Sequence, residues 1–397
     1  MSRPLSYIGV LTFLSILLLG CKEKNVLNKG IYEIIESDSG KIQTQRMHPV
    51  AKRLKELDVP GVSVAVIDDY RIHDLITFGN RDSLNFVNSN TIFQAASVSK
   101  YVTAIIVHQF ISQGLLDLDT DVNQYLKSWK VPKNDFTQDT PVTLRLLLSH
   151  QSGLPSTNFD FDKNQGVPTL VQILNADSPA INEPAIPNAI PGSRWSYSNI
   201  GYALIQQILE DITDKSFQQI AKETLFIPLQ LNSSTFQYPL PPNFENNEAK
   251  PHDKFGKEQP SQLELPAKAQ GGLMTTPADL AKLTTEIMKG YENNSKTFSK
   301  KTVQRLLQNE LELPFRFYNQ KAFMGLGVLL IGENENLAFI HSGYNSPGSV
   351  CIVMGFPSIG KGAVISANSA NGEKLYLEIL ATLANKFDWP NGQFFKH

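Results

Sequence analysis

A serine and a lysine three residues apart, Ser97 and Lys100, could form a nucleophile and its base. In a helix, residues i and i+3 share a face, so the hydroxyl and the amine can touch. A serine hydroxyl becomes a good nucleophile when a neighbour removes its proton, and a lysine whose pKa is lowered by burial can do so. The stretch 101–111 that follows is almost wholly apolar, which predicts a buried Lys100 near the start of a central helix. The amino terminus of that helix would bring backbone N–H groups close to Ser97.

The same S-x-x-K pattern occurs at Ser358 and Lys361, in a turn where no helix would bring the two side chains together. The helical context therefore favours Ser97 and Lys100. Structural interpretations of these two residues remain open at this point. Ser97 could be a helix cap, and Lys100 could be a surface lysine whose stem covers apolar residues while its amine reaches water.

A tyrosine and an asparagine, Tyr197 and Asn199, stand just before a predicted helix that starts at Ile200. A phenol beside a lysine can shuttle protons, and an asparagine side chain can hold a substrate amide. The structural alternative for Tyr197 is a core residue. A second Y-x-N, at Tyr291 and Asn293, lies in a hydrophilic loop that is more typical of solvated surface.

A third motif, His341-Ser342-Gly343, ends a predicted strand. A small residue followed by glycine on an exposed strand edge lets a substrate backbone approach, while His341 and Ser342 offer donors to a carboxylate. The structural alternative for His341 is a polar residue at a strand end. Lys254-Phe255-Gly256 has a similar pattern, but it lies in the segment 236–266, whose Pro, Asn and Gln content predicts a long surface excursion.

In this order along the chain, the three motifs resemble those of the serine β-lactamase and penicillin-binding protein superfamily. The Y-x-N motif resembles that of its class C β-lactamases, D-alanyl-D-alanine carboxypeptidases and family VIII esterases. The resemblance covers about residues 46–390. It extends to four longer segments: 146–155 (LLLSHQSGLP), 191–202 (PGSRWSYSNIGY), 270–279 (QGGLMTTPAD) and 341–348 (HSGYNSPG).

This resemblance implies a role for each residue. Ser97 would be the acylated nucleophile, and Lys100 and Tyr197 would share its proton and return it to the leaving group. Asn199 would orient the substrate amide. The backbone N–H groups of Ser97 and Tyr344 would hold the oxyanion.

The third motif departs from the class C pattern, which usually shows Lys-Thr-Gly where this chain has His341-Ser342-Gly343. An H-x-G motif resembles the carboxypeptidase and esterase branches. Efficient hydrolysis of β-lactams is therefore not expected, because deacylation separates a β-lactamase from a protein that penicillin merely inactivates.

Strand patterns at both ends of the chain, with helical patterns between them, predict the fold that positions these residues. We expect an α+β fold: an antiparallel sheet formed from both chain ends, flanked by helices, with an inserted, mostly helical lobe. The α/β lobe would take about residues 46–96 and 320–390, and the helical lobe about 97–319. The predicted strands are 62–67, 72–78, 325–331, 337–342, 349–354 and 362–367, and the predicted helices are 97–112, 144–148, 200–212, 217–225, one beginning after Thr276, and 373–387.

Composition excludes several classes of protein. The 397 residues carry 36 Lys+Arg and 38 Asp+Glu, a net charge of −2, with 41% hydrophobic residues, so neither disorder nor nucleic-acid binding is expected. No histidine spacing indicates zinc. The Asp117-x-Asp119-x-Asp121 run has Val122 where a calcium loop needs glycine, so we expect no metal and no cofactor. We interpret His150 as a residue of local hydrogen bonding.

The amino terminus predicts export. Residues 1–20 have a basic residue, an apolar stretch too short to span a bilayer, and Leu-Leu-Gly before Cys21, which resembles a bacterial lipobox. The resemblance implies a signal peptide at 1–20, lipidation of Cys21 and a tether at 21–45. The alternatives are an ordinary signal peptide or an uncleaved anchor. Cys351, in an apolar run, is expected to be a buried core thiol.

These patterns predict a lipid-anchored serine hydrolase of the bacterial cell envelope, facing the periplasm or the cell surface, followed by a short tail at 391–397. It would act through an acyl-enzyme on a D-amino-acid peptide, an ester or a β-lactam. The alternative is an envelope protein that binds penicillin or peptidoglycan without turnover. The substrate would be a small molecule or derived from peptidoglycan. The sequence leaves open which substrate it is, how efficient deacylation is, which membrane holds the anchor and the oligomeric state.

Overall fold

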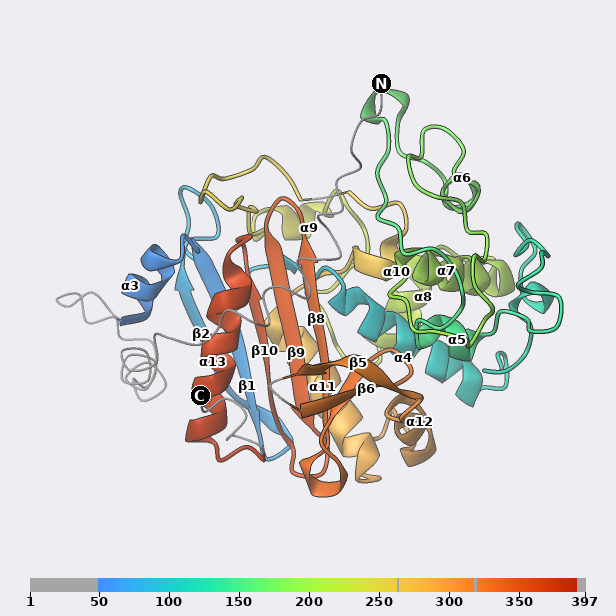
Figure 1. Ribbon diagram of the computed structural model, residues 1–397. Helices are drawn as coiled ribbons and strands as arrows, with labels where there is room; N and C mark the ends of the chain where they lie inside the picture. The colour runs from blue at the N-terminus through green and yellow to red at the C-terminus, as the bar shows by residue number, and fades with distance from the viewer. Residues whose placement is uncertain (1–48, 263, 318–319, 391–397) are drawn as a thin grey trace.

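The computed structural model describes residues 49–262, 264–317 and 320–390. The predicted leader, Cys21, the whole of the predicted tether and the tail 391–397 lie outside the described residues. An antiparallel sheet of eight strands crosses the molecule in the order β2-β1-β10-β9-β8-β7-β6-β5 (Figure 1). The strands are β1 Gly61–Asp68, β2 Arg71–Gly79, β5 Leu311–Phe317, β6 Gln320–Met324, β7 Leu329–Ile331, β8 Ala338–Asn345, β9 Ser349–Phe356 and β10 Lys361–Ala367, and a separate pair is formed by β3 Phe93–Gln94 and β4 Met274–Thr275.

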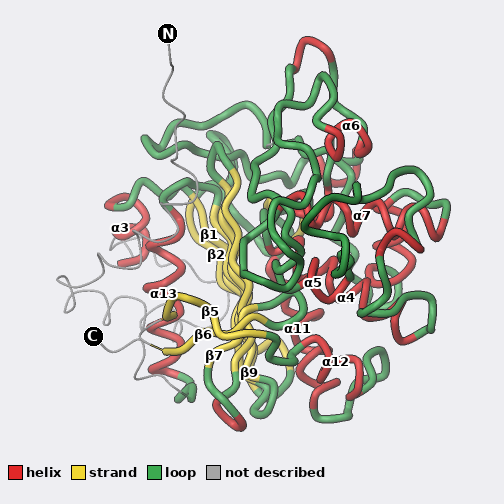
Figure 2. Tube along the Cα trace, turned by 45° about the vertical axis from the view of Figure 1, so that its right-hand side comes forward, coloured by secondary structure: helices red, strands yellow, loops and turns green. Residues whose placement is uncertain are grey.

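Helices cover both faces of this sheet, as Figure 2 shows with the strands seen nearly edge-on. The α-helices are α3 Pro49–Glu56, α4 Val98–Ser112, α5 Leu144–Leu148, α6 Leu170–Asn175, α7 Asn199–Thr213, α8 Phe217–Ala221, α9 Pro242–Glu245, α10 Lys268–Gly271, α11 Pro277–Tyr291, α12 Lys300–Leu306 and α13 Gly372–Lys386. Short 3-10 turns lie at Val122–Gln124, Lys163–Gln165 and Asn334–Asn336, and a π-helical turn, Lys222–Phe226, follows α8.

The two ends of the chain meet in the sheet. β1 pairs with β2 as a hairpin and, on its other side, with β10 near the carboxyl end. The predicted α+β fold with a sheet closed by distant segments is therefore confirmed.

Alternation along β1 buries both faces of the sheet. Val64 and Val66 belong to the core that α13 covers through residues such as Leu380. Ala65 and Ile67 belong to the core on the opposite face, which α4 and α11 cover. The sequence of a strand that is buried on both faces is a nearly continuous apolar run, and the sequence of β1 has that pattern.

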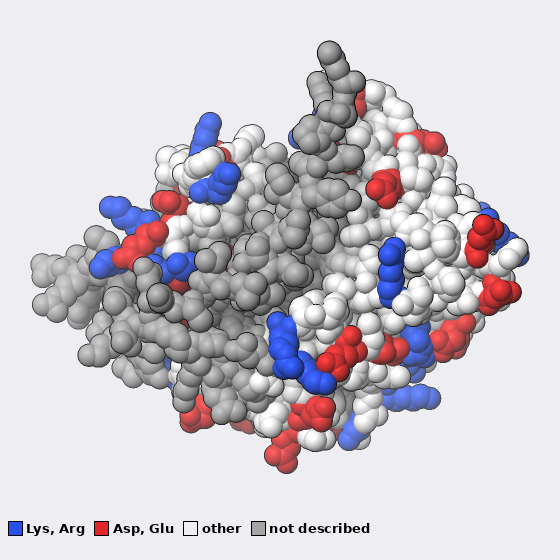
Figure 3. Space-filling model, viewed as in Figure 1, with Lys and Arg blue, Asp and Glu red and all other residues white. Residues whose placement is uncertain are grey.

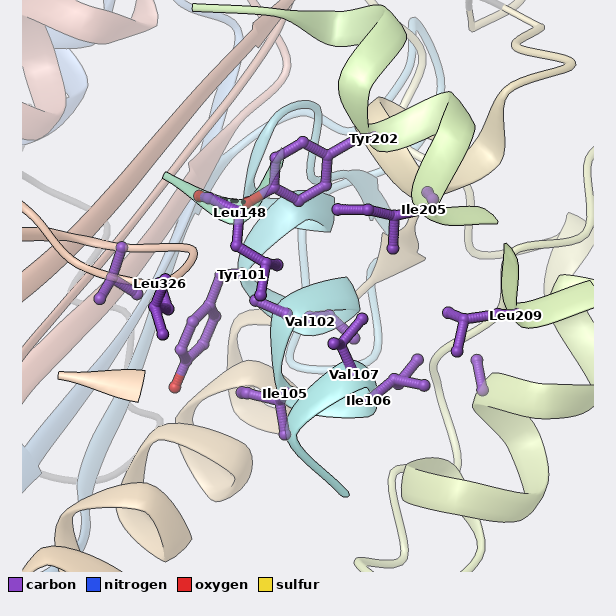
Figure 4. Close-up of a cluster of buried hydrophobic side chains, with 14 of the residues drawn as sticks. Tyr101, Val102, Ile105, Ile106, Val107, Leu148, Tyr202, Ile205, Leu209 and Leu326 are labelled. Carbon is purple, nitrogen blue, oxygen red and sulfur yellow. Dashed lines mark hydrogen bonds between the residues drawn. The ribbon is translucent and has the colours of Figure 1, made fainter. Parts of the chain in front are cut away.

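The central helix α4 is buried, as predicted from its apolar surface, and it packs against strands β8 and β9 and against helices α10 and α12. Figure 4 shows its side chains against residues of α7, and the Tyr202 hydroxyl donates to the Leu148 main-chain oxygen at 3.3 Å. Except for Leu326, whose loop precedes β7, the labelled residues come from α4, α5 and α7: Tyr101, Val102, Ile105, Ile106, Val107, Leu148, Tyr202, Ile205 and Leu209.

Some predicted elements differ in extent. The strand predicted over 325–331 is reduced to β7, because Gly327 adopts φ +108, a left-handed conformation that interrupts a strand. The helix predicted over 217–225 ends at Ala221 and continues as a π-helical turn. The structure also contains β5 and β6, which the sequence analysis did not predict; β5 is only partly buried and includes Pro314.

Charged side chains of both signs are intermixed on the face drawn in Figure 3. This distribution agrees with the net charge of −2. None of the helices in the described part of the chain is long and apolar enough to cross a membrane.

Candidate active site

Ser97 stands at a sharp turn between strand β3 and helix α4. The turn is held by the Ala95 N–H, which donates to the Leu273 oxygen at 2.8 Å, and Ala96 adopts a left-handed φ of +50. Ser97 occupies the N-cap position of α4, but its side chain makes no capping hydrogen bond. Its N–H has no acceptor among the described residues. The left-handed φ of Ala96 is a strained conformation for a residue other than glycine. Such strain persists where surrounding contacts enforce it, often at functional sites.

The Lys100 amine lies beside the Ser97 hydroxyl. Its Nζ is 3.1 Å from Ser97 Oγ and donates to the main-chain oxygen of Gln270 at 2.6 Å. The whole side chain is 0% exposed, so the interpretation as a surface lysine is wrong. Burial lowers the pKa of Lys100 well below its usual value, which favours the neutral amine that can accept a proton.

Tyr197 completes a three-residue cluster. The Lys100 Nζ lies 4.9 Å from the centroid of its ring. Burial raises the pKa of Tyr197 to about 12, and a hydrogen bond to the Ser97 side chain opposes this shift. The phenol is therefore protonated at neutral pH and can exchange a proton with Ser97.

Helix α7 places Asn199 at its first turn. Ser198 caps this helix: its Oγ accepts the Gly201 N–H at 3.1 Å and donates to the Pro155 oxygen at 2.9 Å. The Asn199 Nδ2 lies 3.3 Å from Asn158 Oδ1, while its Oδ1 is buried with no partner among the described residues. This oxygen is available to accept an N–H from a ligand.

The edge of β8 lies against the backbone of Ser97. Among the described residues, β7 pairs only with 338–340, so from His341 onward β8 has a strand partner only on its β9 side. A Cβ added to Gly343 would lie 2.5 Å from Ser97 N, which shows how closely the two backbones approach. Asn345 fixes this approach, since its Nδ2 donates to Gln94 Oε1 at 2.8 Å and to the Gly271 oxygen at 3.0 Å.

His341 adds no positive charge to the site. Burial, and secondly the charge of Lys100, lower the pKa of His341 to about 3, so the ring is neutral at physiological pH. Its Nδ1 lies 2.9 Å from the Ser342 main-chain oxygen. Because a carbonyl oxygen accepts, Nδ1 carries the proton in this contact and Nε2 is left as an acceptor. The Ser342 hydroxyl and backbone N–H groups are then the donors of this motif.

The structure adds two residues that the motifs did not include. Gln270 supplies the oxygen that holds Lys100, and His150 packs its ring 4.4 Å from that of Tyr197. Both lie in the longer segments of the family resemblance, 146–155 and 270–279, which carried the signal that could have found them.

The competing motif of the same type is not assembled into a site. The Ser358 hydroxyl donates to the Asn334 oxygen at 3.4 Å, and the Lys361 amine donates to the Phe387 oxygen at 2.6 Å. The two side chains therefore have separate partners. In contrast, the Lys100 amine contacts both Ser97 Oγ, at 3.1 Å, and the Tyr197 ring, whose centroid lies 4.9 Å away.

Comparison with known proteins identifies similar chains. The family model described as Beta-lactamase matches residues 48–385. Penicillin-binding protein 4 of Amycolatopsis lactamdurans is 32% identical over 180 residues, which cover 45% of this chain and 45% of that protein. The chain thus matches less than half the length of the first curated relatives.

Solved structures share the fold. A penicillin-binding protein homologue from Pyrococcus abyssi, described as octameric, superposes with a TM-score of 0.70 at 23% identity over 86% of this chain and 76% of that one. The D-amino acid amidase of Ochrobactrum anthropi SV3, solved with L-phenylalanine, gives a TM-score of 0.65 at 20% identity, covering 85% and 96% of the two chains.

Proposed function

The chain belongs to the beta-lactamase family, and from this premise we propose that it is a serine hydrolase that acts through an acyl-enzyme on Ser97. The observation that carries the proposal is the wholly buried Lys100, whose amine lies 3.1 Å from Ser97 Oγ. A buried lysine with a lowered pKa is a base suited to activating serine.

In the acylation step, the neutral Lys100 amine accepts the Ser97 proton, with the Tyr197 phenol sharing it. The Oγ then attacks the substrate carbonyl. The N–H groups of Ser97 and Tyr344 stabilise the oxyanion that forms. When the tetrahedral intermediate collapses, the bond to the leaving group breaks, the leaving group takes the proton, and an ester joins Ser97 to the acyl group.

In the deacylation step, a water molecule attacks the ester carbonyl. Tyr197 and Lys100 take the water proton and return it to Ser97 Oγ as the acid leaves. Throughout, the free Oδ1 of Asn199 accepts an N–H from the substrate amide.

For the substrate, we propose a D-amino-acid peptide or an ester rather than a rapidly hydrolysed β-lactam. Support comes from the structural neighbour described as a D-amino acid amidase and from a further neighbour solved with D-Leu. Between these two, the neutral His341 favours the ester, because this position offers no fixed cation to a substrate carboxylate.

Covalent labelling tests the nucleophile. A fluorophosphonate or a fluorescent penicillin should form an adduct on Ser97 of the native protein, seen by peptide mass spectrometry, and none in Ser97→Ala. Ser358→Ala is the matched control, since Ser358 is the serine of the unassembled motif, and it should label like the native protein. Equal labelling of native protein and Ser97→Ala would contradict the proposal.

The fate of the adduct separates the two functions that the sequence left open. We expect p-nitrophenyl esters and D-Ala-D-Ala peptides to turn over repeatedly, with product exceeding protein. A stable adduct on Ser97 with no turnover on esters, peptides or a chromogenic cephalosporin would instead identify an envelope protein that binds without hydrolysis.

We also propose that the protein is exported and anchored by a lipid on Cys21, so that it works at a membrane surface of the cell envelope. The support is the leader sequence alone.

A further inference from the structure

His150 occupies a backbone position that normally favours a smaller residue. It follows helix α5 and its carboxyl-terminal cap Ser149, and it adopts φ +59. Glycine, and less often asparagine, usually takes this left-handed position after a helix. His150 is also only 2% exposed, so a large polar ring is buried at a strained backbone. The imidazole must therefore make contacts that glycine could not.

Those contacts hold the segment 196–198, which carries Tyr197 at its centre. The Ser196 N–H donates to the His150 main-chain oxygen at 2.8 Å, and the Ser198 N–H donates to His150 Nδ1 at 3.1 Å. The ring itself lies against the Tyr197 ring, with centroids 4.4 Å apart. His150 thus contacts the chain on both sides of the phenol and the phenol itself.

The Ser198 contact also defines the protonation state. Because Nδ1 accepts a hydrogen bond, the proton of the neutral ring is on Nε2, which is buried with no partner among the described residues. The titratable groups that face the ring from other elements include Lys100 from α4 and His341 from β8, and burial is the first cause that lowers the pKa of His150 well below its usual value. A neutral ring preserves the Nδ1 acceptor.

We propose that His150 is the positioning residue for the Tyr197-Ser198-Asn199 segment, which it holds through Nδ1 and through the face of its ring. It touches no substrate and acts through Tyr197 and Asn199. The inference rests on the proposed function, because the role of these two residues in turnover belongs to that proposal.

Two substitutions separate positioning from simple structural support. Asparagine tolerates a left-handed backbone, and its Oδ1 can accept the Ser198 N–H; glycine tolerates the backbone best but has no acceptor. We expect His150→Asn to keep kcat for a p-nitrophenyl ester within about 5-fold of the native value. His150→Gly should lower kcat by about 30- to 100-fold with KM changed less than about 3-fold, the scale of a misplaced catalytic group.

Melting temperatures serve as the control, because glycine relieves the backbone strain while it removes the ring contacts. If the loss of kcat follows the melting temperature in both variants, or if His150→Gly keeps native kcat, the inference is overturned. Equal losses in His150→Asn and His150→Gly at unchanged melting temperature would also overturn the hold through Nδ1, since asparagine keeps an acceptor for the Ser198 N–H and glycine does not.

Nuclear magnetic resonance supplies a readout that needs no turnover. In native protein at neutral pH, the ¹⁵N shifts of His150 should show an unprotonated, hydrogen-bonded Nδ1 and a protonated Nε2. With ¹³C-labelled tyrosine, Tyr197 should ionise with a pKa of about 12 in native protein and with a lower pKa in His150→Gly, because water would enter the space left by the ring. If the fluorophosphonate or penicillin forms no adduct on Ser97 of the native protein, the proposed function is refuted. If the Nδ1 of His150 is protonated, or if the pKa of Tyr197 is the same in His150→Gly as in native protein, the role of His150 is refuted.

Discussion

At the residue scale, the chemistry depends on an amine that is kept neutral. Lys100 has no exposed surface, and burial is the cause of its lowered pKa. Its hydrogen-bond partners among the described residues are uncharged: Ser97 Oγ and the main-chain and side-chain oxygens of Gln270. Because none of these partners is a carboxylate, the desolvation of the charged form dominates and the free base is favoured.

The pH dependence of kcat/KM should report this amine. A base must be unprotonated, so activity should fall as the pH drops through the folded-state pKa of Lys100, well below 10.5, and stay high above it. Lys100→Arg should lower kcat about 10³-fold or more at every pH, since a guanidinium stays charged. Initial rates across pH measure both effects.

His341→Asn is the control for this limb. Because the pKa of His341 is about 3, its ring does not titrate in the working range, and its removal should leave the midpoint of the acid limb in place even if the rate changes. A midpoint that moves or disappears in His341→Asn would show that the histidine, and not Lys100, is the titrating base.

At the scale of elements, the site is made by one strand edge meeting one helix start. Among the residues that the structure describes, β7 pairs only with 338–340, so the edge of β8 from His341 onward has no strand partner on that side. The start of α4 contributes the Ser97 N–H, which has no acceptor among the described residues. Gly343 allows the two backbones to approach, and Asn345 ties β8 to Gln94 and Gly271.

Gly343→Ala tests this approach. The new Cβ would lie 2.5 Å from Ser97 N and 2.6 Å from the Ala95 oxygen, so β8 or the Ser97 turn must shift. We expect kcat for ester hydrolysis to fall by about 10²-fold, the typical cost of one misplaced oxyanion donor.

Gly201→Ala in α7 is the matched control. Its nearest neighbour would be a Leu147 side-chain carbon at an ordinary 3.5 Å, so activity should be retained and the helix stabilised by about 0.5–1 kcal/mol in thermal unfolding. Full activity of Gly343→Ala would show that the edge of β8 does not form the oxyanion site.

At the scale of the whole molecule, catalytic groups come from segments more than two hundred residues apart. Ser97 and Lys100 begin α4, Tyr197 precedes α7, and His341 lies in β8. The antiparallel pairing of β1 with β10 brings the first and the last strands of the described chain into one sheet. The described residues thus bring the proposed catalytic groups together in one body, and the proposed anchor at Cys21 precedes this body in the sequence.

Cys21→Ser tests the anchor. Expressed as the full chain in a bacterial host, the native protein should incorporate labelled palmitate and sediment with membranes, because lipidation of this thiol would supply the attachment. The variant should lose both properties and keep its ester hydrolase activity. Palmitate incorporation by Cys21→Ser would contradict lipidation at this position, and Cys351 offers no substitute, since it is wholly buried.

Much of this protein was determined by local sequence. The i, i+3 spacing of Ser97 and Lys100 needs only a helix to bring hydroxyl and amine together, and an apolar stretch from Tyr101 predicts both the helix and the burial. Likewise, apolar runs at both chain ends predicted the sheet, because a strand buried on both faces leaves a strong hydrophobic signal.

Only the tertiary structure decided the rest. Local context favoured the S-x-x-K motif at Ser97 over the one at Ser358, but the oxygen that holds Lys100 comes from Gln270, 170 residues away, and only long-range packing supplies it. The same holds for His150, whose contact with the Ser198 N–H spans 48 residues. Local pattern gives the chemistry that a residue can perform, whereas burial and partners, which set its pKa and its geometry, arise only when distant segments pack together.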